Sequence, residues 1–282
     1  MEGEAPAEPF PQMPDVTNHP SRSRFGSPEC PPTTVLCAGA RNVTAHCQLV
    51  DFSLVERELV DIVSPMNREV QAIFRAKVAD GLAASVPEFT RRDVHVPAVR
   101  GKVFAVIGMR RSGKTTFLWQ CLADRVTAGK PREALLYCNF EDERLADMTA
   151  SELQWVVEEY FALHPEWRDQ QVVTFFLDEI QVVPGWETFV RRLLDSEKME
   201  LFISGSSARL LSREVATSMR GRAMEVLVHP FSLREVLRHH GAEPRGPSTA
   251  LPKAARSVVE KHFRTYLTDG GFPEAQGLST RD

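Results

Sequence analysis

Gly108-Met109-Arg110-Arg111-Ser112-Gly113-Lys114-Thr115 is the stretch that decides the fold of this 282-residue chain. It matches the pattern G-x-x-x-x-G-K-[ST], in which two glycines let the backbone curl so that successive N–H groups point at phosphate oxygens. The apolar run 103–107 precedes it, and a helical stretch, 115–126, follows it. A strand, a glycine loop and a helix in this order predict a phosphate-binding loop with the positive end of the helix facing the anion.

Each part of this loop has an expected role in holding a nucleoside triphosphate. Lys114 would reach the β- and γ-phosphates, and the Thr115 hydroxyl would ligate Mg²⁺. The predicted nucleotide-binding residues are Gly108, Met109, Arg110, Arg111, Ser112, Gly113, Lys114, Thr115 and Thr116. The guanine signature Asn-Lys-x-Asp does not occur in the sequence, which favours ATP over GTP.

A second motif follows the apolar run 172–177. Asp178 and Glu179 come directly after it, at the carboxyl end of a predicted strand, where open α/β sheets bind their ligands. Asp178 would hold Mg²⁺ through its water shell, because magnesium gives up water reluctantly. Glu179 would orient and polarise the attacking water, which is most of what phosphoryl transfer needs. We expect this pair and the phosphate loop to lie side by side on adjacent strand ends.

Two further sets of residues are candidates that each have a structural alternative. Ser204 or Ser206, at the end of a strand, would contact the γ-phosphate or the attacking water; the alternative is a helix cap on residues 208–211. Arg220 or Arg222 would stabilise transition-state charge, commonly from a neighbouring subunit; the alternative is an exposed salt bridge. The predicted catalytic residues are Glu179, Lys114, Arg220, Arg222 and Ser206, and the predicted metal ligands are Thr115 and Asp178.

Apolar runs that alternate with helical stretches predict an α/β fold with a mostly parallel sheet covered by helices on both faces. The expected strands are 103–107, 134–140, 172–177, 200–204 and 223–228. Besides 115–126, helices are expected after the capping boxes that begin at Thr149 and Ser232, and over 185–196 and 254–267. The predicted domains are a tail (1–50), N-terminal helices with a connector (51–100), the nucleotide-binding core (101–230) and a small helical appendage (231–282).

The first fifty residues are rich in proline and lack a periodic apolar pattern. Such a segment cannot bury enough apolar surface to offset its ordering entropy, which predicts a disordered tail. A wrongly assigned start site would give the same composition. Order is expected to begin near Ser53 with a helix that Pro65 splits in two, the second helix carrying Val70, Ile73, Phe74 and Val78 on one face.

The bulk composition excludes several classes of protein. A net charge of −4, with 26% charged residues, gives no global basic field that would draw the chain to nucleic acid or anionic lipid. No run approaches the roughly 18 apolar residues of a membrane span, and the acidic N-terminus lacks a signal-peptide pattern, so we expect a cytoplasmic protein. The five cysteines lack short paired spacing, which predicts free thiols. Basic residues over 234–264 are interspersed with glutamates, so a solvated helical face is the first interpretation and nucleic-acid contact the alternative.

The strings quoted above, with several others, resemble a known family. Residues 87–274 are similar to the prokaryotic AAA+ ATPases that typically carry a C-terminal nuclease-like domain of unknown function. The matching strings are 108–116, 137–144, 177–181, 185–187, 204–208, 220–222, 230–235 and 270–274. The resemblance implies an ASCE-type sheet with the two motif strands central and an ATPase that works as an assembly, here a homo-oligomer. It also implies a role for Arg220 or Arg222, and places Gln181 near the γ-phosphate.

Family members continue beyond the string Gly270-Gly271-Phe272-Pro273-Glu274 into their second domain, whereas this chain stops at Asp282. A fragment, a split gene and a degraded copy are all consistent with that departure. The predicted function is Mg²⁺-dependent ATP binding and hydrolysis that drives or switches an unknown protein partner. The alternatives are an ATP-binding switch without significant turnover and a DNA-associated module.

Overall fold

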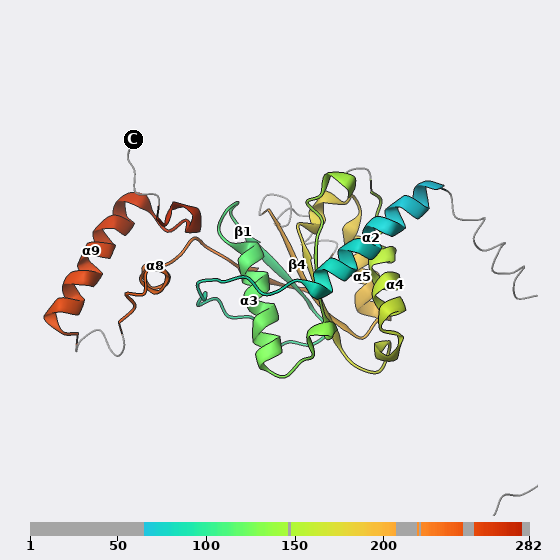
Figure 1. Ribbon diagram of the computed structural model, residues 1–282, viewed down its shortest axis with the longest axis horizontal. Helices are drawn as coiled ribbons and strands as arrows, with labels where there is room; N and C mark the ends of the chain where they lie inside the picture. The colour runs from blue at the N-terminus through green and yellow to red at the C-terminus, as the bar shows by residue number, and fades with distance from the viewer. Residues whose placement is uncertain (1–64, 146–147, 207–218, 220, 245–250, 278–282) are drawn as a thin grey trace, which may run out of the picture. The chain divides into compact units, whose positions relative to one another are not determined.

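The computed structural model describes residues 65–145, 148–206, 219, 221–244 and 251–277, all of which belong to one compact unit, Phe52–Asp282. Five parallel strands form the sheet of this part of the chain, in the order β2-β3-β4-β1-β5 (Figure 1). The strands are β1 (Val103–Gly108), β2 (Leu135–Asn139), β3 (Val173–Asp178), β4 (Met199–Ser206) and β5 (Ala223–Leu227). The predicted α/β fold with a parallel sheet is confirmed.

Helices cover both faces of the sheet because successive side chains of a strand point to opposite faces. Along β1, Val103, Ala105 and Ile107 enter one core, and Phe104 and Val106 enter the other. The first core is shared with α2 (Pro65–Ala83), α4 (Gln154–Leu163) and α5 (Trp186–Ser196), and the second with α3 (Lys114–Thr127). Burial on both faces explains why the strands are nearly continuous apolar runs in the sequence.

Short 3₁₀-helices occupy several connections. They are η1 (Arg132–Ala134), η2 (Glu143–Leu145), η3 (Pro165–Trp167), η4 (Ile180–Val182) and η6 (Pro273–Ala275). Of these, η4 directly follows the acidic pair at the end of β3, and η6 lies in the Gly-Gly-Phe-Pro-Glu string.

The helix expected directly after Thr149 begins only at Gln154. Part of the capping box does form, because Thr149 N donates to Glu152 Oε2 at 2.8 Å. The following turns close between residues three apart, from Glu152 N to Thr149 O (3.1 Å) and from Val156 N to Leu153 O (3.2 Å). Such contacts are of the 3₁₀ type, so the α-helix starts about a turn later than the sequence pattern indicates.

Two helices lie after the sheet, where the sequence predicts them. They are α8 (Leu233–His239) and α9 (Lys253–Asp269). The capping box of α8 is complete: Ser232 Oγ accepts from Glu235 N at 3.3 Å, and Ser232 N donates to Glu235 Oε2 at 2.8 Å. Phe231 N donates to Gly271 O at 2.6 Å, and Tyr266 Oη donates to Phe231 O at 3.0 Å. These bonds tie the segment after α9 to the start of α8.

Several predictions fall outside the described residues. They concern the tail 1–50, the helix at Ser53, the cap on 208–211, Arg220, and the cysteines at 30, 37 and 47. Among the residues that are described, Cys121 and Cys138 are buried free thiols, and burial raises the pKa of each to about 12. None of the helices in the described part of the chain is long and apolar enough to span a membrane.

Candidate nucleotide-binding site

The loop between β1 and α3 owes its conformation to its two glycines. A Cβ added at Gly108 would lie 2.2 Å from Val228 O, so no side chain fits there. Gly113 is the N-cap of α3 with φ 95° and ψ 28°, a left-handed conformation that glycine adopts at low cost. Arg111 also has a positive φ, 66°. The loop therefore curls tightly at the start of the helix, as a phosphate cradle requires.

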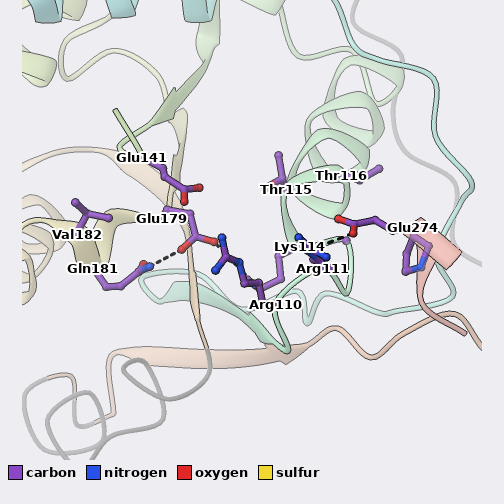
Figure 2. A pocket seen from close by; sticks show the side chains of 12 residues that line it. Arg110, Arg111, Lys114, Thr115, Thr116, Glu141, Glu179, Gln181, Val182 and Glu274 are labelled. Carbon is purple, nitrogen blue, oxygen red and sulfur yellow. Dashed lines mark hydrogen bonds and ion pairs between the residues drawn. The ribbon is translucent and has the colours of Figure 1, made fainter. Parts of the chain in front are cut away.

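Lys114 is the first residue of α3, and its side chain is only 6% exposed. Its Nζ donates to Met109 O at 3.3 Å and lies 3.9 Å from Glu179 Oε1. An ammonium group has three donors, so one long hydrogen bond and one loose ion pair leave it able to bind an anion. Thr115 and Thr116 follow on the first turn of α3 (Figure 2).

A cavity of about 560 Å³ lies over this loop. Its lining comes from the loop and α3, from the ends of β2 and β3, and from the segment after α9. The lining residues are Arg110, Arg111, Gly113, Lys114, Thr115, Thr116, Glu141, Glu179, Gln181, Val182, Pro273 and Glu274 (Figure 2). The volume falls within the roughly 300–1,000 Å³ of small-molecule sites.

Asp178 is the last residue of β3 and is fully buried. Both of its carboxylate oxygens accept hydrogen bonds: Oδ2 from Tyr137 Oη at 2.7 Å, and Oδ1 from Ser204 Oγ. Burial, assisted by the negative charge of Asp178, raises the pKa of Tyr137, so the phenol remains a donor. Asp178 is thereby fixed from both neighbouring strands, β2 and β4.

Ser204 also accepts a hydrogen bond from Glu179 N at 3.0 Å. Because it is completely buried, Ser204 orients the acidic pair from beneath instead of facing the cavity. Its neighbour Ser206, the other predicted contact of the γ-phosphate, ends β4 opposite Gly108 in the sheet register. Ser206 thus lies beside the beginning of the phosphate loop.

Glu179 has a left-handed backbone, with φ 54° and ψ 37°. This conformation costs a residue other than glycine about 1 kcal/mol or more, and such strain clusters at functional sites. The carboxylate lies near Lys114 and accepts a hydrogen bond from Gln181 Nε2 (Figure 2). Gln181 Oε1 is buried and has no hydrogen-bond partner among the described residues.

The two sequence motifs meet, although not on adjacent strands. The expectation of adjacent strand ends is wrong, because β4 lies between β1 and β3. The register aligns Gly108 with Ser206 and Leu177 with Ile203, so both motifs leave the sheet at its carboxyl edge. The long side chains of Lys114 and Glu179 then approach each other past the end of β4, the strand between them. Both motif strands are interior to the sheet, as the family resemblance implied.

Arg222 lies at the opposite edge of the sheet. Its carbonyl accepts from Val103 N at 2.8 Å, at the start of β1, and its Nη1 is 2.6 Å from Asp195 Oδ2 in an exposed ion pair. Within one chain Arg222 therefore does not reach the cavity. Its role toward a neighbouring subunit stays a prediction, as does that of Arg220.

The basic residues of α8 are largely paired with acidic ones. Arg238 Nε and Arg234 Nε lie 2.7 Å and 2.6 Å from the carboxylate of Glu243, and Arg238 Nη1 lies 2.9 Å from Asp93 Oδ1. The charges of α8 are thus largely balanced within the chain.

Sequence reasoning did not name five residues of this region as part of the site: Tyr137, Glu141, Val182, Pro273 and Glu274. Tyr137 supports Asp178, and the other four line the cavity. Arg111 Nε lies 3.2 Å from Glu274 Oε2, which connects the phosphate loop to the segment after α9 (Figure 2). The strings 137–144 and 270–274 carried the signal for all of them except Val182, because both strings belong to the family resemblance, whereas Val182 lies outside every matching string.

A glycine loop follows β1, and a carboxylate pair lies at the end of β3, with β4 between these two interior strands. This arrangement is that of a P-loop nucleotide-binding fold. Residues 100–237 match the family model described as AAA domain, AAA_14. Residues 100–237 are therefore similar to AAA domains, a family of P-loop ATPases.

The curated relatives that the chain matches are uncharacterized proteins. MJ1544 of Methanocaldococcus jannaschii is 30% identical over 223 residues, which are 79% of this chain and 47% of the relative. A protein of Haemophilus influenzae is 33% identical over 172 residues, 60% of this chain and 38% of that protein. The chain thus spans less than half the length of these relatives.

Similar solved structures include the Aeropyrum pernix ORC2 protein, with 14% identity and a TM-score of 0.42 over 76% of this chain and 61% of that one. Another is C. elegans PCH-2, with 15% identity and a TM-score of 0.40 over 74% of this chain and 59% of the other. The similarity to AAA domains rests on the family model over residues 100–237, and the geometry of the loop and the acidic pair agrees with it.

Proposed function

We propose that this chain binds Mg·ATP in the 560 Å³ cavity and hydrolyses it to ADP and phosphate, and that hydrolysis drives or switches a protein partner. The observation that carries the proposal is the approach of Lys114 Nζ to Glu179 Oε1, 3.9 Å apart beside one cavity. A phosphate-binding cation and an acidic group able to act on water thereby face the same space.

The residues present fit a magnesium-bound triphosphate. The close approach at Gly108 and the left-handed Gly113 mean that neither end of the loop carries a side chain, so backbone N–H groups there could meet phosphate oxygens. Thr115, whose side chain is exposed at the cavity, and the buried Asp178 offer the oxygen ligands that Mg²⁺ prefers. Mg²⁺, when bound, would neutralise charge that develops on the transferred phosphoryl group.

The chain's own contribution to hydrolysis is mainly positioning. Lys114 would bind the β- and γ-phosphates, and Glu179 would hold the attacking water and accept its proton. Ser204 fixes the backbone of Glu179, and Gln181 fixes its carboxylate, so the acid is oriented before substrate binds. Preorganisation of this kind lowers the barrier without reorganisation at the moment of reaction.

The test is Glu179→Gln, which keeps the shape of the side chain and removes its negative charge. We expect steady-state phosphate release to fall about a hundredfold or more, equivalent to ~3 kcal/mol, while the Kd of a fluorescent ATP analogue stays within a few-fold. Glu143→Gln, an exposed glutamate outside the cavity, is the matched control and should retain full turnover. Equal turnover of Glu179→Gln and the unmodified chain would refute the assignment of Glu179.

The second candidate function is an ATP-dependent switch with negligible turnover in the isolated chain. One observation favours it: Arg222, a candidate for stabilising transition-state charge, lies at the far edge of the sheet. If a neighbouring copy supplies the arginine, the rate of phosphate release per chain should rise with protein concentration. Tight nucleotide binding without phosphate release at any concentration would support the switch.

A further inference from the structure

Arg92 lies in the connector between α2 and β1 and is buried beside the phosphate loop, with 5% of its surface exposed. Its Nη1 donates to Ser112 O at 2.9 Å, its Nε donates to Glu235 Oε1 at 3.0 Å, and its Nη2 donates to His229 O. The guanidinium also lies 4.8 Å from the centre of the Phe231 ring. One side chain thus joins the phosphate loop, the exit of β5 and α8.

The backbone of Arg92 is held as firmly as its side chain. Arg92 N donates to Gln120 Oε1 at 2.6 Å, and Gln120 Nε2 donates back to Arg92 O at 3.1 Å. Gln120 belongs to α3, the helix that the phosphate loop opens, and is itself buried. The connector is therefore fixed to the helix whose N-terminus forms the cradle.

Glu235 balances the buried charge of Arg92. Besides the bond from Arg92, its carboxylate accepts from Asp93 N at 2.8 Å and from Ser232 N at 2.8 Å. Burial by itself raises the pKa of Glu235, but these hydrogen bonds outweigh it and leave the pKa below its ordinary value. A buried ion pair whose partners are both hydrogen-bonded avoids the desolvation penalty of an unpaired charge.

The bond from Arg92 to Ser112 O has a geometric consequence for the cradle. A trans peptide is planar, so its C=O and the following N–H point in opposite directions. No cis peptide occurs in the described chain. When Arg92 holds the carbonyl of Ser112 on the outer side of the loop, the N–H of Gly113 must face the inner side, where phosphate would lie. Rotation of this peptide would instead turn a carbonyl oxygen toward the anion.

From this geometry we propose that Arg92 is a positioning residue that locks the Ser112–Gly113 peptide in its phosphate-binding orientation and couples the loop to α8 through Glu235. The inference rests on the proposed nucleotide site and extends it by naming the contact through which nucleotide binding reaches the C-terminal helices. An arginine is needed because its planar fork serves three acceptors in fixed directions, which a lysine ammonium does not do.

The test compares Arg92→Lys with Arg91→Lys. Arg91 is the adjacent residue, and its exposed side chain pairs with Asp124 at 2.7 Å, on the same helix α3. Titration with fluorescent ADP in the presence of Mg²⁺ should give a Kd about tenfold or more higher for Arg92→Lys, because one charge-assisted cradle contact is lost. Arg91→Lys should stay within twofold of the unmodified chain.

A second measurement separates positioning of the peptide from general loosening of the fold. In the unmodified chain, Mg·ADP should slow hydrogen–deuterium exchange in residues 108–116 and also in α8. In Arg92→Lys at saturating Mg·ADP, the loop should still be protected, whereas the protection of α8 should be lost. A general loss of structure would instead raise exchange across the sheet with or without nucleotide.

The outcomes are distinct. Equal ADP affinity of Arg92→Lys and the unmodified chain, or loop protection without any change in α8 of the unmodified chain, would overturn this inference and leave the proposed function standing. An unmodified chain that does not bind Mg·ADP would overturn both. If Arg92→Lys does not fold, which circular dichroism will show, the exchange measurement on the unmodified chain decides alone.

Discussion

Charged side chains lie at both ends of the parallel strands, but they are paired loosely at the carboxyl edge and tightly at the amino edge. At the carboxyl edge, Lys114 makes one 3.3 Å hydrogen bond and lies 3.9 Å from Glu179. At the amino edge, Arg125 makes two bonds to the carboxylate of Glu200, at 2.7 Å and 2.6 Å, and Lys130 donates to Thr174 Oγ1 at 2.6 Å. The charges of the amino edge are matched by each other, whereas those of the carboxyl edge are matched only loosely.

The surroundings of the charged groups differ between the two edges. The guanidinium of Arg125 also lies 4.4 Å from the centre of the Phe202 ring, so its surroundings are complete without a ligand. Around Glu179, by contrast, the backbone is left-handed and Gln181 Oε1 has no partner in the described part of the chain. Unmatched polar groups and strain together indicate the edge where a ligand binds.

The largest expected effect comes from the two lysines. Lys114→Met should weaken binding of fluorescent ADP about a hundredfold, because it removes a charged donor to phosphate worth roughly 3 kcal/mol. Lys130→Met, the matched change at the amino edge, should leave the Kd within twofold. If both variants bind ADP equally well, the contrast between the edges has no functional meaning.

Sequence reasoning predicted the carboxyl edge well because its signals are local. The loop 108–115 and the pair Asp178–Glu179 are each contiguous, and each follows a recognisable apolar run. The strand order was missed, since neither run records that β4 inserts between β1 and β3.

The supporting residues depend on contacts between distant positions. Arg91 and Arg92 are adjacent in the sequence and chemically identical. Arg91 is nevertheless exposed, whereas Arg92 is buried and bound to Glu235, 143 residues away. Glu235 itself was predicted, but only as part of a capping box, because that role is local. Its second role, neutralising Arg92, exists only in the folded chain.

Arg125 tests the structural role of the amino edge. Arg125→Met retains the apolar stem but leaves the partly buried Glu200 without its bidentate partner, so the free energy of unfolding should fall by about 2 kcal/mol. Urea denaturation measures this loss, and affinity for ADP should be unchanged at low urea. The double variant with Glu200→Gln should recover part of the loss, because the carboxylate that loses its bidentate partner is then removed. If Arg125→Met is as stable as the unmodified chain, the amino-edge cluster does not contribute to the free energy of unfolding.

The weakest effect that we expect is on the pH dependence of stability, through the carboxylate of Glu200 in the same cluster. Burial raises the pKa of Glu200, but the hydrogen bonds and charge of Arg125, with Lys130, more than compensate and lower it below the ordinary 4.5. A carboxylate whose pKa is depressed by folding contributes stability that is complete above 4.5 and is lost as the pH falls through the folded-state value. The unfolding free energy should therefore drop more steeply below pH 4.5 in the unmodified chain than in Glu200→Gln. Parallel curves would mean that Glu200 titrates alike in the folded and unfolded states, and that its ion pair is too weak to distinguish the amino edge from ordinary surface.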